Sequence, residues 1–180
     1  MSAWLSFVLF QGVWFAAVLG AAKGEPLLGP ASGALLVALA LKTTPDLRAE
    51  LLSILAALCV ALILDGGLGG TGWVRYQAHP GPAWLAPSWI LALWAGFATT
   101  LAPALAWLAR RRLLAALLGA VFGPIAYASG QRLGALSVLD PRAYVLLVGG
   151  WAAATPGLIA LSSWLHRAGA GPDVDAQVAA

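Results

Sequence analysis

The sequence predicts an all-α integral membrane protein, a polytopic helix bundle with six transmembrane helices. The chain has 180 residues, of which 61% are hydrophobic and 9% are charged. An ordinary soluble domain has about 45–50% apolar and about 25% charged residues, so this chain has too few charges to cover a soluble fold. The third observation is a series of six apolar runs, most of them near the roughly 20 residues that a membrane-spanning helix needs.

These six apolar runs are the predicted helices, and all of them lie within a single domain, residues 1–167. They cover residues 4–22, 27–41, 47–64, 84–108, 113–131 and 143–165. The second run has only 15 residues, so it is either a short span or a re-entrant segment that leaves five transmembrane helices. Prolines in its first turn are compatible with a span, because that position tolerates proline. The polar residues 168–180 are expected to form a disordered tail.

Prolines and glycines predict the shape of the bundle. Pro103, Pro124 and Pro156 lie inside the fourth, fifth and sixth predicted helices. Each removes a backbone hydrogen bond and frees the carbonyl four residues earlier; for Pro103 this is the carbonyl of Thr99. The kinks either shape helix packing or outline a cavity. Small residues spaced by four, as on the fifth helix, predict close helix contacts.

Basic residues predict the orientation of the helices. With six helices, the loops on the side of both termini carry six Lys and Arg residues, and the opposite loops carry four. The first set is Lys42, Arg48, Arg110, Arg111, Arg112 and Arg167, and the second is Lys23, Arg75, Arg132 and Arg142. Cytoplasmic loops carry the excess of basic residues, so both termini are expected to be cytoplasmic.

An acidic and a basic residue at matching depth form the centre of a candidate polar site. Asp65 ends the third predicted helix, roughly 13 Å to the outer side of the midplane, and Arg132 follows the fifth helix at roughly 14 Å on the same side. The two charges are therefore expected to pair. Lys23, Glu25, Arg75, Asp140 and Arg142 share that layer. The layer is either an ion-pair network that fixes helix ends or an outward-facing site for a polar head group or small anion.

Three further polar residues extend the candidate site. Tyr127 and Gln131 are four residues apart and share one face of the fifth helix. With Arg132 they either bind a carboxylate or phosphate, or satisfy one another. Gln11 lies near the middle of the first helix, some 10 Å deeper than Tyr127, so only a cavity would join it to the others. Otherwise Gln11 is an interhelical hydrogen-bonding residue.

Several kinds of chemistry are excluded by what the sequence lacks. Cys59 is the single cysteine, so no intrachain disulfide forms. His79 and His166 are too few for a di-iron centre and lie outside the predicted spans. We therefore predict no catalytic residue, metal site or cofactor. The basic triplet at 110–112 is a topology signal, and nucleic acid is not an expected partner.

The segment after Asp65 carries no phosphate-binding motif. The glycine-rich run at 65–72 lacks the Lys-Ser/Thr ending of a P-loop, and we expect it to be a flexible turn. Residues 73–76 alternate apolar and polar side chains. This stretch is expected to lie along the outer surface.

Several motifs resemble an uncharacterised bacterial inner-membrane family, domain of unknown function 2878. They include Leu9-Phe-Gln-x-x-Trp-Phe15, Leu64-Asp65, Trp84-Leu-Ala-Pro-x-Trp89, Leu93-Trp-x-x-Phe-Ala-x-Thr-Leu101 and Gly123-Pro-x-Ala-Tyr-x-x-Gly-x-Arg-Leu-Gly-Ala135. The resemblance implies a small polytopic protein of the bacterial inner membrane with no established activity. Its motif residues coincide with Gln11, Asp65, Tyr127 and Arg132, which their polarity had already singled out.

Three hypotheses of function follow from these observations. The first is an accessory protein associated with lipids or fatty acyl chains, with an outward polar site at Asp65, Tyr127 and Arg132. The second is a small transporter or channel subunit that uses the kinked helices as a path. The third is a metal-free intramembrane enzyme, although Ser129 has no histidine at its depth. Membrane lipids and other membrane proteins are the expected partners, and the sequence does not determine the oligomeric state.

Overall fold

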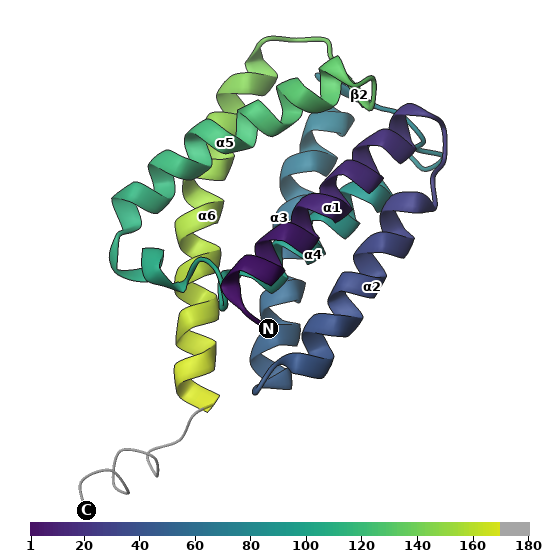
Figure 1. Ribbon diagram of the computed structural model, residues 1–180. Coiled ribbons are helices and arrows are strands. Elements are labelled where there is room, and N and C mark those ends of the chain that lie inside the picture. The colour runs from purple at the N-terminus through teal and green to yellow at the C-terminus, as the bar shows by residue number, and fades with distance from the viewer. Residues whose placement is uncertain (170–180) are drawn as a thin grey trace, which may run out of the picture.

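The computed structural model describes residues 1–169 of the chain. This part contains six α-helices, one 3-10 helix and two short strands (Figure 1). In chain order they are α1 (Ala3–Ala22), α2 (Leu28–Thr43), α3 (Leu47–Gly70), β1 (Val74–Tyr76), α4 (Ser88–Leu101), η1 (Ala106–Arg110), α5 (Arg112–Arg132), β2 (Leu136–Val138) and α6 (Arg142–Gly169). Of the predicted tail, residues 168 and 169 belong to α6, and the remainder lies outside the described residues.

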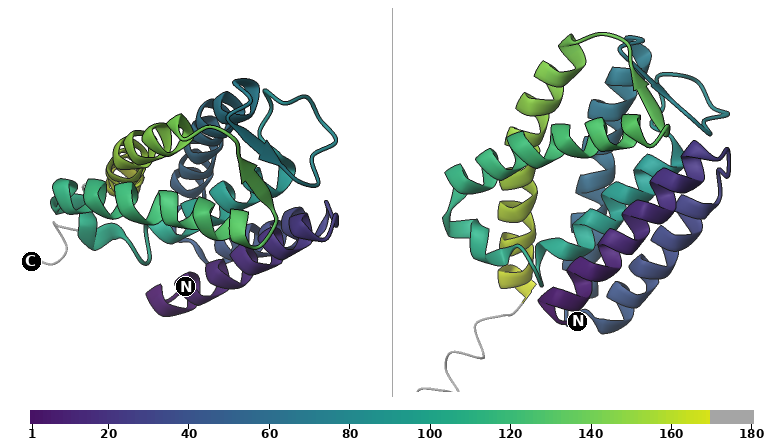
Figure 2. Two further views of the ribbon diagram at one scale, coloured as in Figure 1. Left: turned by 90° about the horizontal axis from the view of Figure 1, so that it is seen from above. Right: turned by 45° about the horizontal axis from the view of Figure 1, so that its top comes forward.

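The helices form two groups joined through α3. In the first group, α4 packs against α1, α2 and α3. In the second, α6 packs against α3 and α5. Figure 2 shows α5 crossing α6 on one side of the molecule, with α1 and α2 side by side on the other. Because α1 and α5 belong to different groups, few direct contacts join these two helices.

Four helices in the described part are long and apolar enough to cross a membrane, namely α1, α3, α5 and α6. The remaining two, α2 and α4, have 16 and 14 residues. At about 1.5 Å per residue they are about 24 and 21 Å long, shorter than the roughly 30 Å hydrocarbon core of a bilayer. The structure thus supports an all-helical membrane protein with four candidate spans rather than the six expected.

The predicted fourth helix, residues 84–108, is divided in the structure. The helix α4 ends at Leu101, so Pro103 lies beyond a helix end instead of inside a kinked helix. The expected freeing of the Thr99 carbonyl does occur. That carbonyl accepts a hydrogen bond from the Ser6 hydroxyl of α1 at 3.3 Å. Pro124 and Pro156 do lie inside α5 and α6, as predicted.

The glycine-rich run after Asp65 is helical, contrary to the expected flexible turn. The helix α3 continues to Gly70, and Gly66, Gly69 and Gly70 face the loop before α4. A Cβ atom on Gly66 or Gly69 would clash with the backbone carbonyl of Trp84 or Ala83, respectively. Glycine is required here because the loop backbone packs directly on the helix, and this contact keeps the last turns of α3 in place.

A two-stranded antiparallel sheet joins the loops at the end of the bundle where α3 ends and α6 begins. Val74 of β1 pairs with Val138 of β2, and Tyr76 pairs with Leu136. Val74 and Tyr76 are buried, whereas Arg75 between them is exposed. The stretch expected to lie along the surface is therefore a strand with one buried face, which directs Tyr76 into the protein.

The contact between α5 and α6 depends on glycine, and we expect Gly123→Ala to destabilise the protein. A Cβ at Gly123 would overlap the ring of Trp151, and relieving such overpacking costs about 1–3 kcal/mol of unfolding free energy. The control is Gly149→Ala on α6, whose Cβ would meet no atom within 4 Å and whose effect is neutral or stabilising. Reversible unfolding in mixed micelles, followed by circular dichroism, measures both. Equal effects of the two substitutions would contradict the packing described.

Candidate functional site

The carboxylate of Asp65 on α3 is fully buried in the interior of the helix bundle and is the centre of a hydrogen-bonded group of side chains. Its Oδ1 accepts hydrogen bonds from the Tyr76 hydroxyl, at 2.9 Å, and from the Tyr127 hydroxyl. Its Oδ2 accepts one from the indole Nε1 of Trp94 at 2.8 Å. The three donors come from β1, α4 and α5. One side chain of α3 therefore connects four elements of the fold.

The three donors account for the presence of a carboxylate inside an apolar bundle. Burying a polar or charged group without hydrogen bonds costs several kcal/mol, and hydrogen bonds to an ionised group are stronger than neutral ones. Burial also raises the pKa of the Tyr76 hydroxyl, and the nearby Asp65 carboxylate raises it further. Tyr76 therefore stays protonated and remains a hydrogen-bond donor.

Aromatic rings continue from Asp65 toward the interior of the bundle. Trp94 stacks on Trp151 of α6, with ring centroids 4.5 Å apart and an interplanar angle of 18°. Phe97 packs edge-on against both indoles, at 6.2 Å from Trp94 and 5.7 Å from Trp151. Asp65 holds Trp94 by its indole nitrogen, so the carboxylate also fixes the ring on which Trp151 rests.

These aromatic residues form part of the wall of a cavity of about 650 Å³ between α1, α4, α5 and α6. All five phenylalanines of the chain line it. The aromatic lining residues are Phe7, Phe10, Trp14, Phe15, Trp89, Trp94, Phe97, Phe122, Tyr127 and Trp151. Aliphatic residues such as Val18, Ile90 and Leu118 form much of the remaining wall. The cavity is therefore suited to an apolar occupant.

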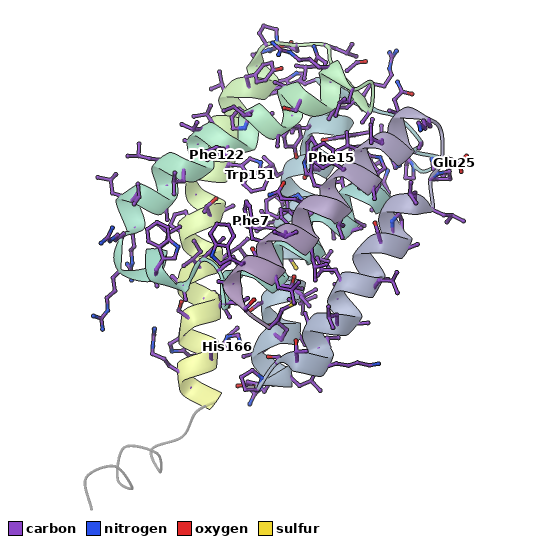
Figure 3. The ribbon with its side chains drawn as sticks, in the orientation of Figure 1. Phe7, Phe15, Glu25, Phe122, Trp151 and His166 are labelled. Carbon is purple, nitrogen blue, oxygen red and sulfur yellow. The ribbon has the colours of Figure 1, made fainter. Side chains whose placement is uncertain are left out.

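The rim of the cavity lies between α1 and α5. Phe7, Phe15 and Phe122 line the cavity and are 46%, 53% and 62% exposed, respectively. Figure 3 shows these three side chains, together with Trp151, gathered in the space between α5 and α1. Both helices are long and apolar enough to cross a membrane, so this opening faces the position that lipid tails would occupy.

A few polar groups interrupt the apolar wall. Gln11 and Tyr127 both line the cavity, as do Ser129 and Thr155. The Ser129 hydroxyl donates to the carbonyl of Ile125 at 2.8 Å. Within residues 1–169, the buried Thr155 hydroxyl and the Trp151 indole nitrogen have no hydrogen-bond partner. A few fixed polar groups in an apolar wall are typical of sites that orient a small molecule.

The structure brings some of the predicted site residues together and separates others. Asp65 and Tyr127 are in direct contact, and Gln11 shares a cavity with Tyr127. The expected Asp65–Arg132 pair is wrong. Arg132 is exposed at the end of α5, and within residues 1–169 it forms no ion pair with Asp65. Gln131 is also exposed, and its side-chain oxygen accepts from the Val138 amide at 2.8 Å.

The reason for this separation is that matching depth does not specify the face of a helix. Asp65 and Arg132 lie near the same end of the bundle, but Asp65 points inward to Trp94 and Arg132 lies at the surface. In the same layer, Asp140 pairs with Arg142 at 2.6 Å. Hydrogen bonds from Arg142 lower the pKa of Asp140. The predicted polar layer thus contains one buried centre and one exposed ion pair.

Sequence reasoning missed Tyr76 and Trp94, the two donors that share Asp65 with Tyr127. The signal for Tyr76 was the alternation of apolar and polar residues at 73–76, which is typical of a half-buried strand. The signal for Trp94 was weaker, since a tryptophan inside an apolar run has no distinctive spacing. Trp89 is also buried, and its indole donates to the Gln77 carbonyl at 3.0 Å.

The site contains no arrangement suited to a metal ion. Among the described residues, no three His, Cys, Asp or Glu side chains are grouped as metal ligands. The buried carboxylate is occupied by three donors, so it acts on the cavity by holding Tyr127 and Trp94 in position. The arrangement is therefore a set of fixed hydrogen-bonding groups beside an apolar cavity.

Comparison with known proteins identifies the family. The family model described as Protein of unknown function (DUF2878) matches residues 3–157. The chain belongs to this family. The match confirms the resemblance deduced from the motifs and includes every residue of the cavity wall. No curated protein and no solved structure matches the chain.

We expect Tyr127→Phe to lower the unfolding free energy by about 1.5–3 kcal/mol, because a hydrogen bond to a buried charged group is lost. Tyr144→Phe is the matched control, since Tyr144 is only partly buried and is not among the three donors of Asp65. Combining Tyr127→Phe with Asp65→Asn tests the coupling in a double-mutant cycle of detergent unfolding. Additive effects of the two substitutions would contradict a direct interaction.

Proposed function

We propose that the protein is a membrane-embedded binding protein for a lipid or another molecule with a fatty acyl chain, and that it acts as an accessory to lipid-handling proteins. The observation that carries this proposal is the aromatic cavity that opens between α1 and α5. Its volume of about 650 Å³ lies within the range of about 300–1,000 Å³ typical of small-molecule sites.

The position of the opening supports a lipid-soluble ligand. Phe7, Phe15 and Phe122 at the rim are exposed, and α1 and α5 are candidate membrane spans. A hydrocarbon chain would therefore enter sideways from the bilayer without crossing water. Inside, it would contact the Trp94–Trp151 stack and the aromatic rings around it.

The polar groups of the wall support a ligand with a polar end. Gln11 on α1 and Tyr127 on α5 line the same cavity and would orient that end. Tyr127 is fixed by Asp65, so its position is set before any ligand binds. Asp65 is thus a positioning residue of the proposed site, and Arg132 is outside it.

The setting that best suits this function is the bacterial inner membrane, with all six helices embedded and both termini cytoplasmic. The loops at the terminal side carry the larger number of basic residues. The short helix α4 would be accommodated because α1, α2, α3 and α6 pack around it. The short helix α2 would be held by its contacts with α1 and α4. Local thinning of the bilayer is a known response to short spans.

The ligand proposal is tested with a photoreactive palmitic acid that carries a diazirine, added to the protein in lipid nanodiscs. We expect crosslinks to concentrate on cavity-lining residues of α1 and α5. Ala126→Phe fills the cavity from α5 and should lower this labelling about tenfold, equivalent to about 1.4 kcal/mol of binding. Ala128→Phe, on the same helix but not in the cavity wall, should leave it unchanged. Labelling spread evenly over all helices would overturn the proposal.

The orientation is tested by cysteine labelling in spheroplasts, after Cys59→Ala removes the native thiol. Thr43→Cys lies at the end of α2 on the terminal side, and Leu133→Cys lies just after α5 on the opposite side. A membrane-impermeant maleimide should label position 133 and not position 43, because only the former would face the outside. Labelling at 43 with protection at 133 would reverse the orientation.

A further inference from the structure

A second, smaller cavity lies at the end of the bundle where α2 and α6 end and α3 begins. Its volume is about 250 Å³. The lining residues are Met1, Ala40, Thr43, Thr44, Pro45, Glu50, Thr99, Ala102, Pro103 and His166. Figure 3 shows His166 near the end of α6. None of these residues belongs to the aromatic cavity, so the two sites are separate.

The notable residue in this cavity is Glu50, a carboxylate on the first turn of α3 that is only 4% exposed. Within residues 1–169 no side chain or backbone group donates a hydrogen bond to it. The nearest basic nitrogen is His166 Nε2, at 3.8 Å from Oε2, which is beyond hydrogen-bonding distance. Glu50 therefore differs from Asp65, whose oxygens are all engaged.

The tautomer of His166 follows from its other contact. Nδ1 of the ring lies 2.9 Å from the backbone carbonyl of Ser162. A carbonyl can only accept, so Nδ1 carries the proton, and in the neutral ring Nε2 is an acceptor. With the ring neutral, two acceptors, the Glu50 carboxylate and His166 Nε2, face one another across 3.8 Å. A positively charged donor that contacts both would satisfy them at the same time.

The rest of the cavity wall supplies acceptors as well. The Thr43 hydroxyl donates to the Leu39 carbonyl at 3.0 Å, and the Thr99 hydroxyl donates to the Gly96 carbonyl at 2.7 Å. Their hydroxyl protons are thus committed, and their oxygen lone pairs remain available. Met1 also borders the cavity. Its amino group attracts the Glu50 carboxylate electrostatically, but within the described residues the two groups form no ion pair.

We propose that Glu50 and His166 form a binding site for a primary ammonium group. Such a group carries one positive charge and three N–H donors, which match the carboxylate, the imidazole Nε2 and a threonine oxygen. The cavity is smaller than the about 300 Å³ at which drug-sized sites begin, so it suits a compact amine. Its place at the ends of three helices also makes it accessible to an aminophospholipid head group.

The proposal is tested first on the wild-type protein in phosphatidylglycerol nanodiscs, by calorimetric titration with ethanolamine and with choline. Choline has a similar charge but no N–H donor. We expect ethanolamine to bind at least about tenfold more tightly, a difference of about 1.4 kcal/mol. Because this comparison needs no substitution, it is independent of any effect of mutation on folding. Equal or undetectable binding of the two amines would overturn the proposal.

The residue assignment is tested with Glu50→Gln, which should lower ethanolamine affinity at least about tenfold. Glu25→Gln is the control, an exposed acidic residue between α1 and α2, and should bind as the wild type does. Unchanged binding by Glu50→Gln would contradict the assignment.

The source of the amine is tested by native mass spectrometry of protein from discs with equal phosphatidylethanolamine and phosphatidylglycerol. Retained phosphatidylethanolamine that Glu50→Gln loses would identify a lipid head group. Ethanolamine binding without lipid retention would identify a free amine, and either result supports the ammonium site.

Discussion

The hydrogen bonding of one buried carboxylate holds the two groups of helices together. Asp65 on α3 takes donors from β1, α4 and α5, and α3 also packs against α6. In an apolar interior the cost of leaving such a group without donors is large. The need to supply Asp65 with donors therefore positions β1, α4 and the part of α5 that carries Tyr127. The aromatic rings around Trp94 pack against this centre.

The aromatic cavity results from the close packing of α5 on α6, which glycines of α5 allow. Gly119 and Gly123 of α5 lie directly against α6, where a side chain would overlap Thr155 or Trp151. This close approach holds α5 on α6 and leaves it away from α1. The rings of Trp94, Trp151 and the phenylalanines then line the space between α5 and α1 instead of filling it.

Much of the helical fold could be predicted from the sequence, because lipid requires each spanning segment to satisfy its own backbone. The predicted runs 4–22 and 113–131 agree with α1 and α5 to within one residue at each end. The run 84–108 failed because its hydropathy continues through Pro103, whereas the backbone hydrogen bonding does not. Hydropathy measures the environment of a segment and is insensitive to a helix end inside it.

The candidate site was predicted only in part, for a different physical reason. The energetic cost of placing polar groups in lipid pointed to Asp65 and Tyr127. The same criterion favours charged residues over neutral ones as partners of a buried carboxylate. Arg132 was therefore preferred over Tyr76 and Trp94 as a partner, although a phenol and an indole are the donors that fit an apolar interior. Glu50 was overlooked because one carboxylate in a first helical turn is ordinary, and only the tertiary structure shows that it is buried.

The spacing of the Asp65 donors along the chain has a consequence for biosynthesis. Tyr76, Trp94 and Tyr127 follow Asp65 by 11, 29 and 62 residues. A chain made from its amino end therefore presents the carboxylate to the translocation machinery before its last donor exists. The acid gains its hydrogen bonds one after another as the loop, α4 and α5 emerge, so the polar centre is complete only after Tyr127 has been made.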